Sequence, residues 1–200
     1  MIHGTAQLTG PNSLVVGDRT VSFDNCIVAA GSQAATLPFL PEDPRIIDST
    51  DALELPNVPK RLLVIGGGII GLELATVYDA LGSRVTVVEL LDQLLPGCDA
   101  DLVRPLQKRI TKRYEGIHIA TEVRSVKALK SGLRVELSNG ASDTFDGILV
   151  AVGRKPNGHQ IDAGAAGVTV DSSSFIPVDR QLRTNVPWIY AIGDIVGEPM

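Results

Sequence analysis

The sequence has few of the residues that usually carry redox or metal chemistry. Its 200 residues include two cysteines and three histidines, and only 4% are aromatic. Cys26 and Cys98 lie far apart and form no CxxC pair, so the sequence predicts neither a disulfide framework nor a metal site. His3, His118 and His159 share no motif with a neighbouring base or nucleophile. No single residue is therefore predicted to be a catalytic nucleophile or a metal ligand.

The chain also lacks a strong charge and a long apolar run. Eighteen basic residues stand against 23 acidic ones, a formal net charge of −5, which argues against nucleic acid or an anionic membrane surface as a partner. The longest apolar stretch, residues 62–75, contains glycines and Glu73 and is too short to span a bilayer. No charged segment followed by an apolar run marks a secretory signal at Met1. We therefore expect a soluble protein of the cytoplasm.

Apolar patterns divide the chain into three expected regions, residues 1–55, 56–155 and 156–200. The first contains short strands and then a proline-rich connection, which excludes a long helix. The second alternates buried strands with helices, which is typical of a parallel sheet. Its expected strands are 61–65, 85–89, 117–120, 123–129, 133–137 and 145–152, and its expected helices are 70–81 and 101–114. The predicted class is α/β, a Rossmann-like βαβ domain with an antiparallel β-meander, flanked by partial segments of a second domain.

The two expected helices have further predicted features. Ile70, Leu74, Val77 and Leu81 recur at steps of three and four residues, which predicts the buried face of the first helix. Pro105 is expected near the first turn of the second helix, where a missing N–H leaves no helical bond unmade. Gly116 is expected to end that helix.

A glycine-rich turn lies between the first strand and the first helix of the second region. It has the pattern GxGxxG, and each glycine has a physical role. Gly66 permits a tight turn, Gly68 lets the backbone approach a pyrophosphate, and Gly71 lets the helix pack closely on the strand. The amino end of the helix offers free N–H groups and a partial positive charge to the phosphates. Strand, glycines and helix together predict a dinucleotide site, and the alternative is a glycine turn that binds nothing.

Glu89 distinguishes between the two nicotinamide cofactors. It ends the next strand, about 20 residues after the turn, where an acidic residue accepts hydrogen bonds from the adenine ribose. A carboxylate there repels the 2′-phosphate of NADP, and the following residues, Leu90, Leu91 and Asp92, include no arginine. The sequence therefore predicts NAD rather than NADP.

Three motifs in order resemble those of the pyridine nucleotide-disulfide oxidoreductases. They are Gly-Gly-Gly-Ile-Ile-Gly-Leu-Glu at 66–73, Ala-Val-Gly-Arg-Lys-Pro-Asn at 151–157, and Thr-Asn-Val-Pro-Trp-Ile-Tyr-Ala-Ile-Gly-Asp at 184–194. The last resembles the family's second FAD motif. Within the family, residues 48–55 and 182–187 are most similar to the dihydrolipoamide dehydrogenases of bacterial 2-oxo-acid dehydrogenase complexes. The resemblance covers the whole chain, so the three regions would be the end of a FAD-binding domain, the NAD-binding domain, and a return segment.

The resemblance implies contacts with two cofactors. On the NAD side, Gly66, Gly67, Gly68, Ile69, Ile70 and Gly71 would hold the pyrophosphate, Glu89 the adenine ribose, Val123 the adenine, and Glu73, Ala151, Val152, Gly153 and Arg154 the nicotinamide end. On the FAD side, Gly4 would contact the adenine, Gly193 and Asp194 the ribitol, and Ala30, Gly31 and Ser32 would form a flavin-side turn. Glu73 is explained equally well as a solvated carboxylate in a helix's first turn, and Ala30 to Ser32 as a turn that ends a strand.

Other features of the family are absent from these 200 residues. The first FAD-binding GxGxxG motif and the closely spaced redox cysteines are missing, and the interface domain with its His-Glu acid–base pair would follow Met200. We therefore expect an internal segment that binds NAD without turnover and does not hold FAD tightly. The whole protein would oxidise dihydrolipoamide with NAD⁺ through a disulfide and FAD, as a homodimer within a 2-oxo-acid dehydrogenase complex.

Three alternatives remain. A related flavin disulfide reductase or soluble transhydrogenase shares the motifs, although Glu89 counts against NADP-dependent members. A stand-alone, non-catalytic nucleotide-binding module is a second alternative, but such a module has no use for the flavin motif that ends at Asp194. A structural protein with an empty βαβ unit is the third, and it leaves the three glycines and Glu89 without a role.

Overall fold

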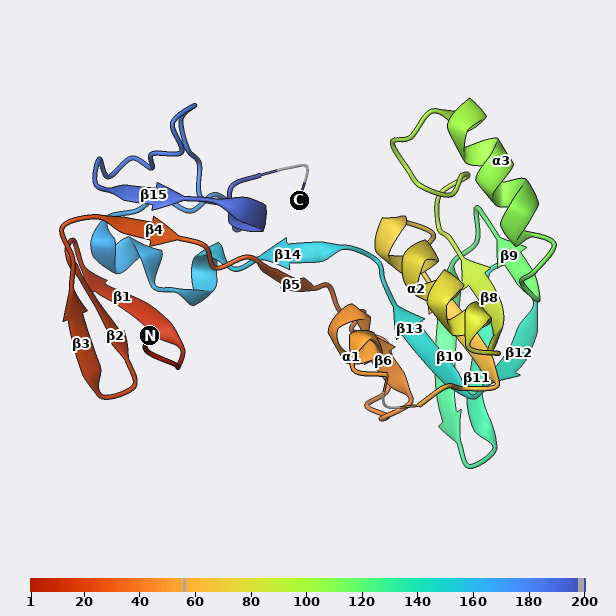
Figure 1. Ribbon diagram of the computed structural model, residues 1–200. Coiled ribbons are helices and arrows are strands. Elements are labelled where there is room, and N and C mark those ends of the chain that lie inside the picture. Colours follow the sequence, from red (N-terminus) through yellow and green to blue (C-terminus); the bar gives the residue numbers. More distant parts are fainter. Residues whose placement is uncertain (56, 198–199) are drawn as a thin grey trace. The chain divides into compact units, whose positions relative to one another are not determined.

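The computed structural model describes residues 1–55, 57–197 and 200, in two compact units (Figure 1). Unit 1 comprises residues 1–33 and 154–200, and unit 2 comprises residues 34–153. The first boundary differs from the expected one because β6 (Ile46–Asp48) pairs with a strand of unit 2. Pro56, at which the second region was expected to begin, lies outside the described residues.

The centre of unit 2 is a sheet of five parallel strands. The middle strand is β7, in which Leu62, Leu63, Val64 and Ile65 are all buried. Such complete burial is typical of a parallel strand covered on both faces. In spatial order the strands are β6, β13 (Gly147–Val150), β7 (Arg61–Ile65), β8 (Arg84–Val88) and β9 (Gly116–His118). The Rossmann-like sheet expected from the sequence is therefore present, with β6 as an additional edge strand.

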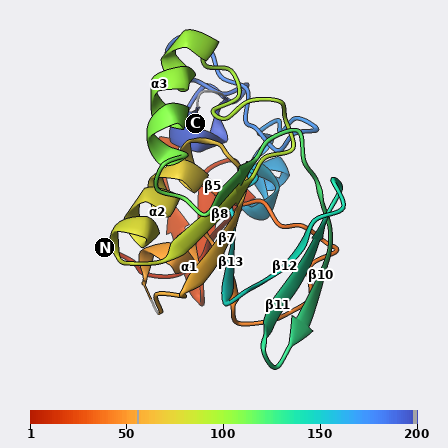
Figure 2. The same cartoon turned by 90° about the vertical axis from the view of Figure 1, so that its right-hand side faces the viewer.

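Helices pack against one face of this sheet and a second sheet packs against the other (Figure 2). The helices are α1 (Ser49–Leu53), α2 (Ile69–Ala80) and α3 (Ala100–Ile110). The second sheet is antiparallel and consists of β10 (Val123–Leu129), β11 (Gly132–Leu137) and β12 (Ser142–Phe145). The predicted hairpin is thus confirmed, and β12, which has few apolar residues, was not predicted.

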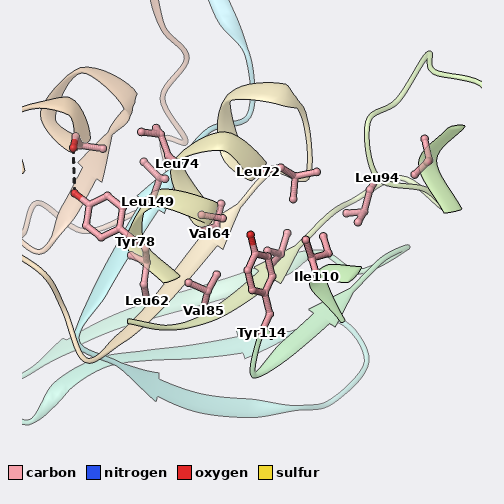
Figure 3. Close-up of a cluster of buried hydrophobic side chains, with 14 residues drawn as sticks. Leu62, Val64, Leu72, Leu74, Tyr78, Val85, Leu94, Ile110, Tyr114 and Leu149 are labelled. Carbon is pink, nitrogen blue, oxygen red and sulfur yellow. Dashed lines mark hydrogen bonds between the residues drawn. The ribbon is translucent and has the colours of Figure 1, made fainter. Parts of the chain in front are cut away.

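Side chains of β7 alternate between two cores, as period-two geometry requires. Leu62 and Val64 join the helical core, whereas Leu63 and Ile65 join the core under the antiparallel sheet. In the helical core, the Tyr78 hydroxyl donates a hydrogen bond to the carbonyl of Ala52, 3.1 Å away (Figure 3). This bond ties α2 to α1.

The buried face of α2 differs from the predicted one. Leu74 is buried as expected, but Val77 and Leu81 are 43% and 50% exposed. Gly71, Leu72, Ala75 and Tyr78 are buried along with Leu74, so the contact face is made largely of other residues than the predicted ones. Periodicity predicted the helix correctly and its orientation only in part.

The third helix also differs from expectation. It ends at Ile110, and Gly116 begins β9 rather than ending the helix. Pro105 is its sixth residue, in the second turn. Its missing N–H therefore leaves the carbonyl of Asp101 without its usual helical partner.

Unit 1 is built from short strands around its own core. That core includes Val28, Ile176, Ile189 and Ile195. β1 (Ala6–Gly10), β2 (Ser13–Val16) and β3 (Arg19–Ser22) form an antiparallel sheet, β4 (Cys26–Val28) pairs in parallel with β15 (Ile189–Ala191), and β5 (Ser32–Ala34) pairs with β14 (Arg154–Pro156). Short 3-10 helices cover residues 158–160, 163–166 and 193–195. In the part of the chain that the structure describes, no helix is long and apolar enough to cross a membrane.

Candidate functional site

The glycine-rich turn connects β7 to α2 with very little free space at two of its glycines. Gly66 has a φ of +109°, and a Cβ there would lie 2.2 Å from the carbonyl oxygen of Ala151. A Cβ at Gly71 would lie 2.1 Å from the carbonyl oxygen of Gly66. Because both contacts are with backbone atoms, neither position accepts a side chain without movement of the main chain. The geometry agrees with the roles predicted for a tight turn and a close helix–strand approach.

Gly68 has the opposite environment. It is the N-cap of α2, with an extended backbone, and a Cβ there would have no heavy atom within 4 Å. No side chain among the described residues caps this helix end. The first N–H groups of α2 are therefore available to an anion, and the positive end of the helix dipole favours one. The helix end is therefore uncapped and open at this position.

Glu89 lies directly after β8, and its carboxylate contacts the turn. The residue is only 7% exposed. Its Oε2 accepts a hydrogen bond from the N–H of Gly67 at 2.6 Å, and its Oε1 accepts one from the N–H of Leu91 at 2.8 Å. A carboxylate has about four acceptor positions, and these two bonds use two of them. The sequence placed Glu89 near the turn but gave no sign of these backbone contacts.

The other residues expected on the NAD side have different environments. Ala151 is half-buried and its N–H donates to the carbonyl of Ile65 at 2.8 Å, which brings its own carbonyl beside Gly66. Val152, Gly153 and Glu73 are exposed. The Val123 side chain is buried in the core under the antiparallel sheet.

Arg154 belongs to unit 1, where it contacts residues expected on the flavin side. Its Nε donates to Ser32 Oγ at 2.6 Å, and its Nη2 donates to the Ser32 carbonyl at 2.7 Å. Ser32 Oγ in turn donates to Asp194 Oδ2 at 2.6 Å, and Arg154 Nε lies 3.7 Å from the same oxygen. Arg154, implied at the nicotinamide end, is therefore part of an ordered Arg–Ser–Asp network.

Asn157 is a residue of this region that sequence reasoning missed. Its N–H donates to the carbonyl of Gly31 at 3.1 Å, and its Nδ2 donates to that of Ala30 at 2.8 Å. Its Oδ1 is buried without a hydrogen-bond partner among the described residues. Its place at the end of the 151–157 motif was the available signal. Asn157 and Arg154 together fix the turn from Ala30 to Ser32.

Gly4 and Gly193 complete the expected flavin side. Gly4 has a φ of +144° and lines a cavity of roughly 640 Å³ between the chain start and residues 15–19. Gly193, with a φ of +78°, begins the 3-10 helix that contains Asp194. The positive φ values favour glycine at both positions.

The two cysteines are free and lie in different environments. Cys26 lies in β4, where burial raises the pKa of its thiol and favours the unreactive protonated form. Cys98 is exposed, and both are free cysteines.

Comparison with protein families gives one match that covers the whole chain. Residues 1–200 match the model of the family described as pyridine nucleotide-disulphide oxidoreductase. A relative from Haemophilus influenzae, named dihydrolipoyl dehydrogenase, is 54% identical over 100% of this chain and 44% of its own length. A relative from Vibrio cholerae with the same name is 51% identical over the same shares. The chain therefore spans less than half the length of these curated relatives.

Solved structures agree with this assignment. The HOCl-induced flavoprotein disulfide reductase RclA from Escherichia coli superimposes with a TM-score of 0.91 at 28% identity, over 98% of this chain and 46% of that one. A FAD-dependent pyridine nucleotide-disulphide oxidoreductase from Desulfovibrio vulgaris gives a TM-score of 0.79 at 27% identity, over 97% and 52%. The expected fold class is thereby confirmed, with its Rossmann-like parallel sheet. The chain belongs to the pyridine nucleotide-disulphide oxidoreductase family.

Proposed function

We propose that this chain is the NAD-binding portion of a flavin-dependent dihydrolipoyl dehydrogenase. The observation that carries the proposal is the open amino end of α2 at Gly68, next to a turn that is bound by the Glu89 carboxylate. The 54% identity to a relative of that name supports this enzyme over the flavoprotein disulfide reductase that is 28% identical.

In this proposal, the backbone from Gly66 to Ile70 binds the NAD pyrophosphate. The remaining acceptor positions of Glu89 bind the adenine ribose hydroxyls, and its negative charge disfavours the 2′-phosphate of NADP. Val123 contributes to the adenine side, and Glu73 and residues 151–154 to the nicotinamide end.

The whole protein would oxidise dihydrolipoamide through a disulfide and FAD, with NAD⁺ as the final electron acceptor. FAD, when bound, relays electrons between the disulfide and nicotinamide. Asp194, which is held by Ser32 and Arg154, would accept a hydrogen bond from a hydroxyl of its ribitol. Binding NAD in one orientation makes hydride transfer effectively intramolecular. We also propose that the whole protein acts in the cytoplasm as a homodimer within a 2-oxo-acid dehydrogenase complex.

The 200 residues themselves would bind NAD without turnover, because Cys26 and Cys98 are free, lie far apart in the sequence and do not form a closely spaced redox pair. A fluorescence titration with NADH, repeated with NADPH, tests the binding. Saturable NADH binding, with NADPH at least tenfold weaker, is expected. The variant Gly68→Val, whose side chain would occupy the open face, should lose NADH binding while its circular dichroism spectrum is unchanged.

Two results would contradict the proposal. Equal NADH affinity in the parent and in Gly68→Val would remove the site. Steady-state formation of NADH from dihydrolipoamide and NAD⁺ by this chain alone would refute the expected lack of turnover.

A further inference from the structure

Glu89 is hydrogen-bonded through both its main chain and its side chain. Its N–H donates to the carbonyl of His118 at 2.8 Å, and its own carbonyl accepts from the N–H of Thr121 at 3.0 Å. Both side-chain oxygens accept backbone N–H groups, from Gly67 at 2.6 Å and from Leu91 at 2.8 Å. The residue thus joins the end of β8, the end of β9 with the segment that follows it, and the glycine-rich turn.

Burial makes these side-chain bonds important. Glu89 as a whole residue is only 7% exposed, and the hydration that its carboxylate loses is unfavourable unless hydrogen bonds replace the water. The N–H groups of Gly67 and Leu91 supply that replacement, and bonds to an ionised acceptor are stronger than neutral ones. No ion pair of Glu89 is found among the described residues, so the backbone alone stabilises its charge.

Both main-chain polar groups of Gly67 are hydrogen-bonded. Glu89 accepts its N–H, and its carbonyl accepts from the N–H of Leu95 at 2.9 Å. A Cβ at Gly67 would lie 2.5 Å from Leu94 Cδ2 and 3.2 Å from Glu89 Oε2. The next residue is Gly68, whose open face begins α2. The orientation of Gly67 therefore determines where the first N–H groups of the helix point.

We propose that Glu89 is a positioning residue for the pyrophosphate, because its carboxylate fixes the glycine-rich turn in addition to any contact with ribose. This inference rests on the NAD site proposed above. It separates two roles of one side chain: direct recognition of ribose hydroxyls, and organisation of the backbone that binds phosphate. The second role predicts that Glu89 governs affinity for nucleotides that have no ribose hydroxyls at all.

The test compares ADP with 2′,3′-dideoxy-ADP, which lacks both hydroxyls, by calorimetric titration of the chain and of Glu89→Gln. A glutamine offers one oxygen and one NH₂ group, so either Gly67 or Leu91 would have its N–H facing another donor. Affinity for both nucleotides should fall by about tenfold or more. If only ADP binding weakens, Glu89 acts through ribose alone and the proposal is overturned.

Two further variants sharpen the comparison. Asp92→Asn removes an exposed carboxylate three residues further on, and it should leave both affinities within about twofold of the parent. Gly67→Ala keeps the charge of Glu89, but its Cβ would lie 2.5 Å from Leu94 Cδ2 and 3.2 Å from Glu89 Oε2. The turn must then shift relative to Glu89, so this variant should weaken dideoxy-ADP binding as Glu89→Gln does. Parent-like dideoxy-ADP binding by Gly67→Ala would contradict the proposal.

Amide hydrogen exchange without ligand provides a readout that is independent of nucleotide binding. In Glu89→Gln, the protection of the Gly67 or Leu91 N–H should fall at least tenfold, while the N–H of Val87 in β8 stays protected and reports an intact sheet. Unchanged protection at both amides would overturn the proposal. Failure of every variant and of the parent to bind ADP would refute the proposed NAD site, and the exchange result would still decide the role of Glu89.

Discussion

Replacing Gly71 should mainly lower the stability of the fold, whereas replacing Gly68 should mainly weaken nucleotide binding. In Gly71→Ala the new Cβ would lie 2.1 Å from the backbone oxygen of Gly66, so α2 or the turn must move by about 1 Å to reach a normal contact. The turn has little freedom to move, since a Cβ at Gly66 would already lie 2.2 Å from the Ala151 carbonyl oxygen. In Gly68→Ala the new Cβ meets no heavy atom within 4 Å.

The magnitudes follow from these distances. Overpacking against backbone costs about 1–3 kcal/mol, towards the upper end where neither side yields. Alanine recovers about 1 kcal/mol of helix propensity, which leaves a net loss of about 2 kcal/mol for Gly71→Ala. Gly68→Ala replaces an N-cap glycine by a weaker capping residue, a loss below about 1 kcal/mol.

Urea unfolding followed by circular dichroism measures both losses. With a slope of about 2 kcal/mol per molar urea, Gly71→Ala should lower the midpoint by about 1 M and Gly68→Ala by less than half of that. NADH titration should show the complementary result, because Gly68→Ala blocks the phosphate approach in a protein of nearly parental stability. Equal midpoints for the two variants, or a larger loss for Gly68→Ala, would refute this account of the turn.

Three other changes test the contacts that stabilise unit 2. Arg61→Lys keeps the charge but loses the planar guanidinium that donates two hydrogen bonds to the Asp143 carboxylate. The free energy of unfolding in urea should therefore fall by about 1–2 kcal/mol. Parental stability of the variant would show that this paired contact does not stabilise the protein. The Arg45 guanidinium, mainly through its hydrogen bonds, lowers the pKa of Asp43 to about 2. The stability from this pair should be complete above about pH 4 and should be lost as the pH falls through about 2. Asp43→Asn should therefore be less stable than the parent by under about 1 kcal/mol at about pH 6 and equal to it only near about pH 1; a constant difference would contradict this. Tyr78→Phe removes the hydroxyl that bonds to α1, and thermal unfolding should show a loss of about 1–2 kcal/mol, whereas an unchanged melting temperature would mean that this bond contributes nothing.

The central βαβ unit could be predicted because its signals are local. An apolar run forms β7, the glycines form the turn, and the next apolar run forms β8. Short strands were missed for the opposite reason. β6 has only three residues within a proline-rich segment, and it is stabilised by pairing with β13 about a hundred residues later in the chain. That partner is not visible in the local sequence.

For the candidate site, too, the sequence predicted the motif but not the contacts that its residues make. Its pattern, GxGxxG followed by an acidic residue, is visible in the sequence and carries the prediction of a dinucleotide site. The bonds from Glu89 to the N–H groups of Gly67 and Leu91 depend on how β8 lies beside β7, which spacing alone does not define. The network of Arg154 with Ser32 and Asp194 joins residues more than a hundred positions apart, so their motifs could be recognised but not their contacts.

The sequence by itself determined the family, the order of the main elements of unit 2, and the positions that must be glycine or acidic in the motif. These follow from apolar periodicity, backbone freedom and charge, which act between near neighbours. Only the tertiary structure decided the boundaries of the two units, the buried face of α2 and the hydrogen-bond partners of Glu89 and Arg154. These depend on pairing and close packing between segments distant in sequence, where a difference of about an ångström decides which contacts form.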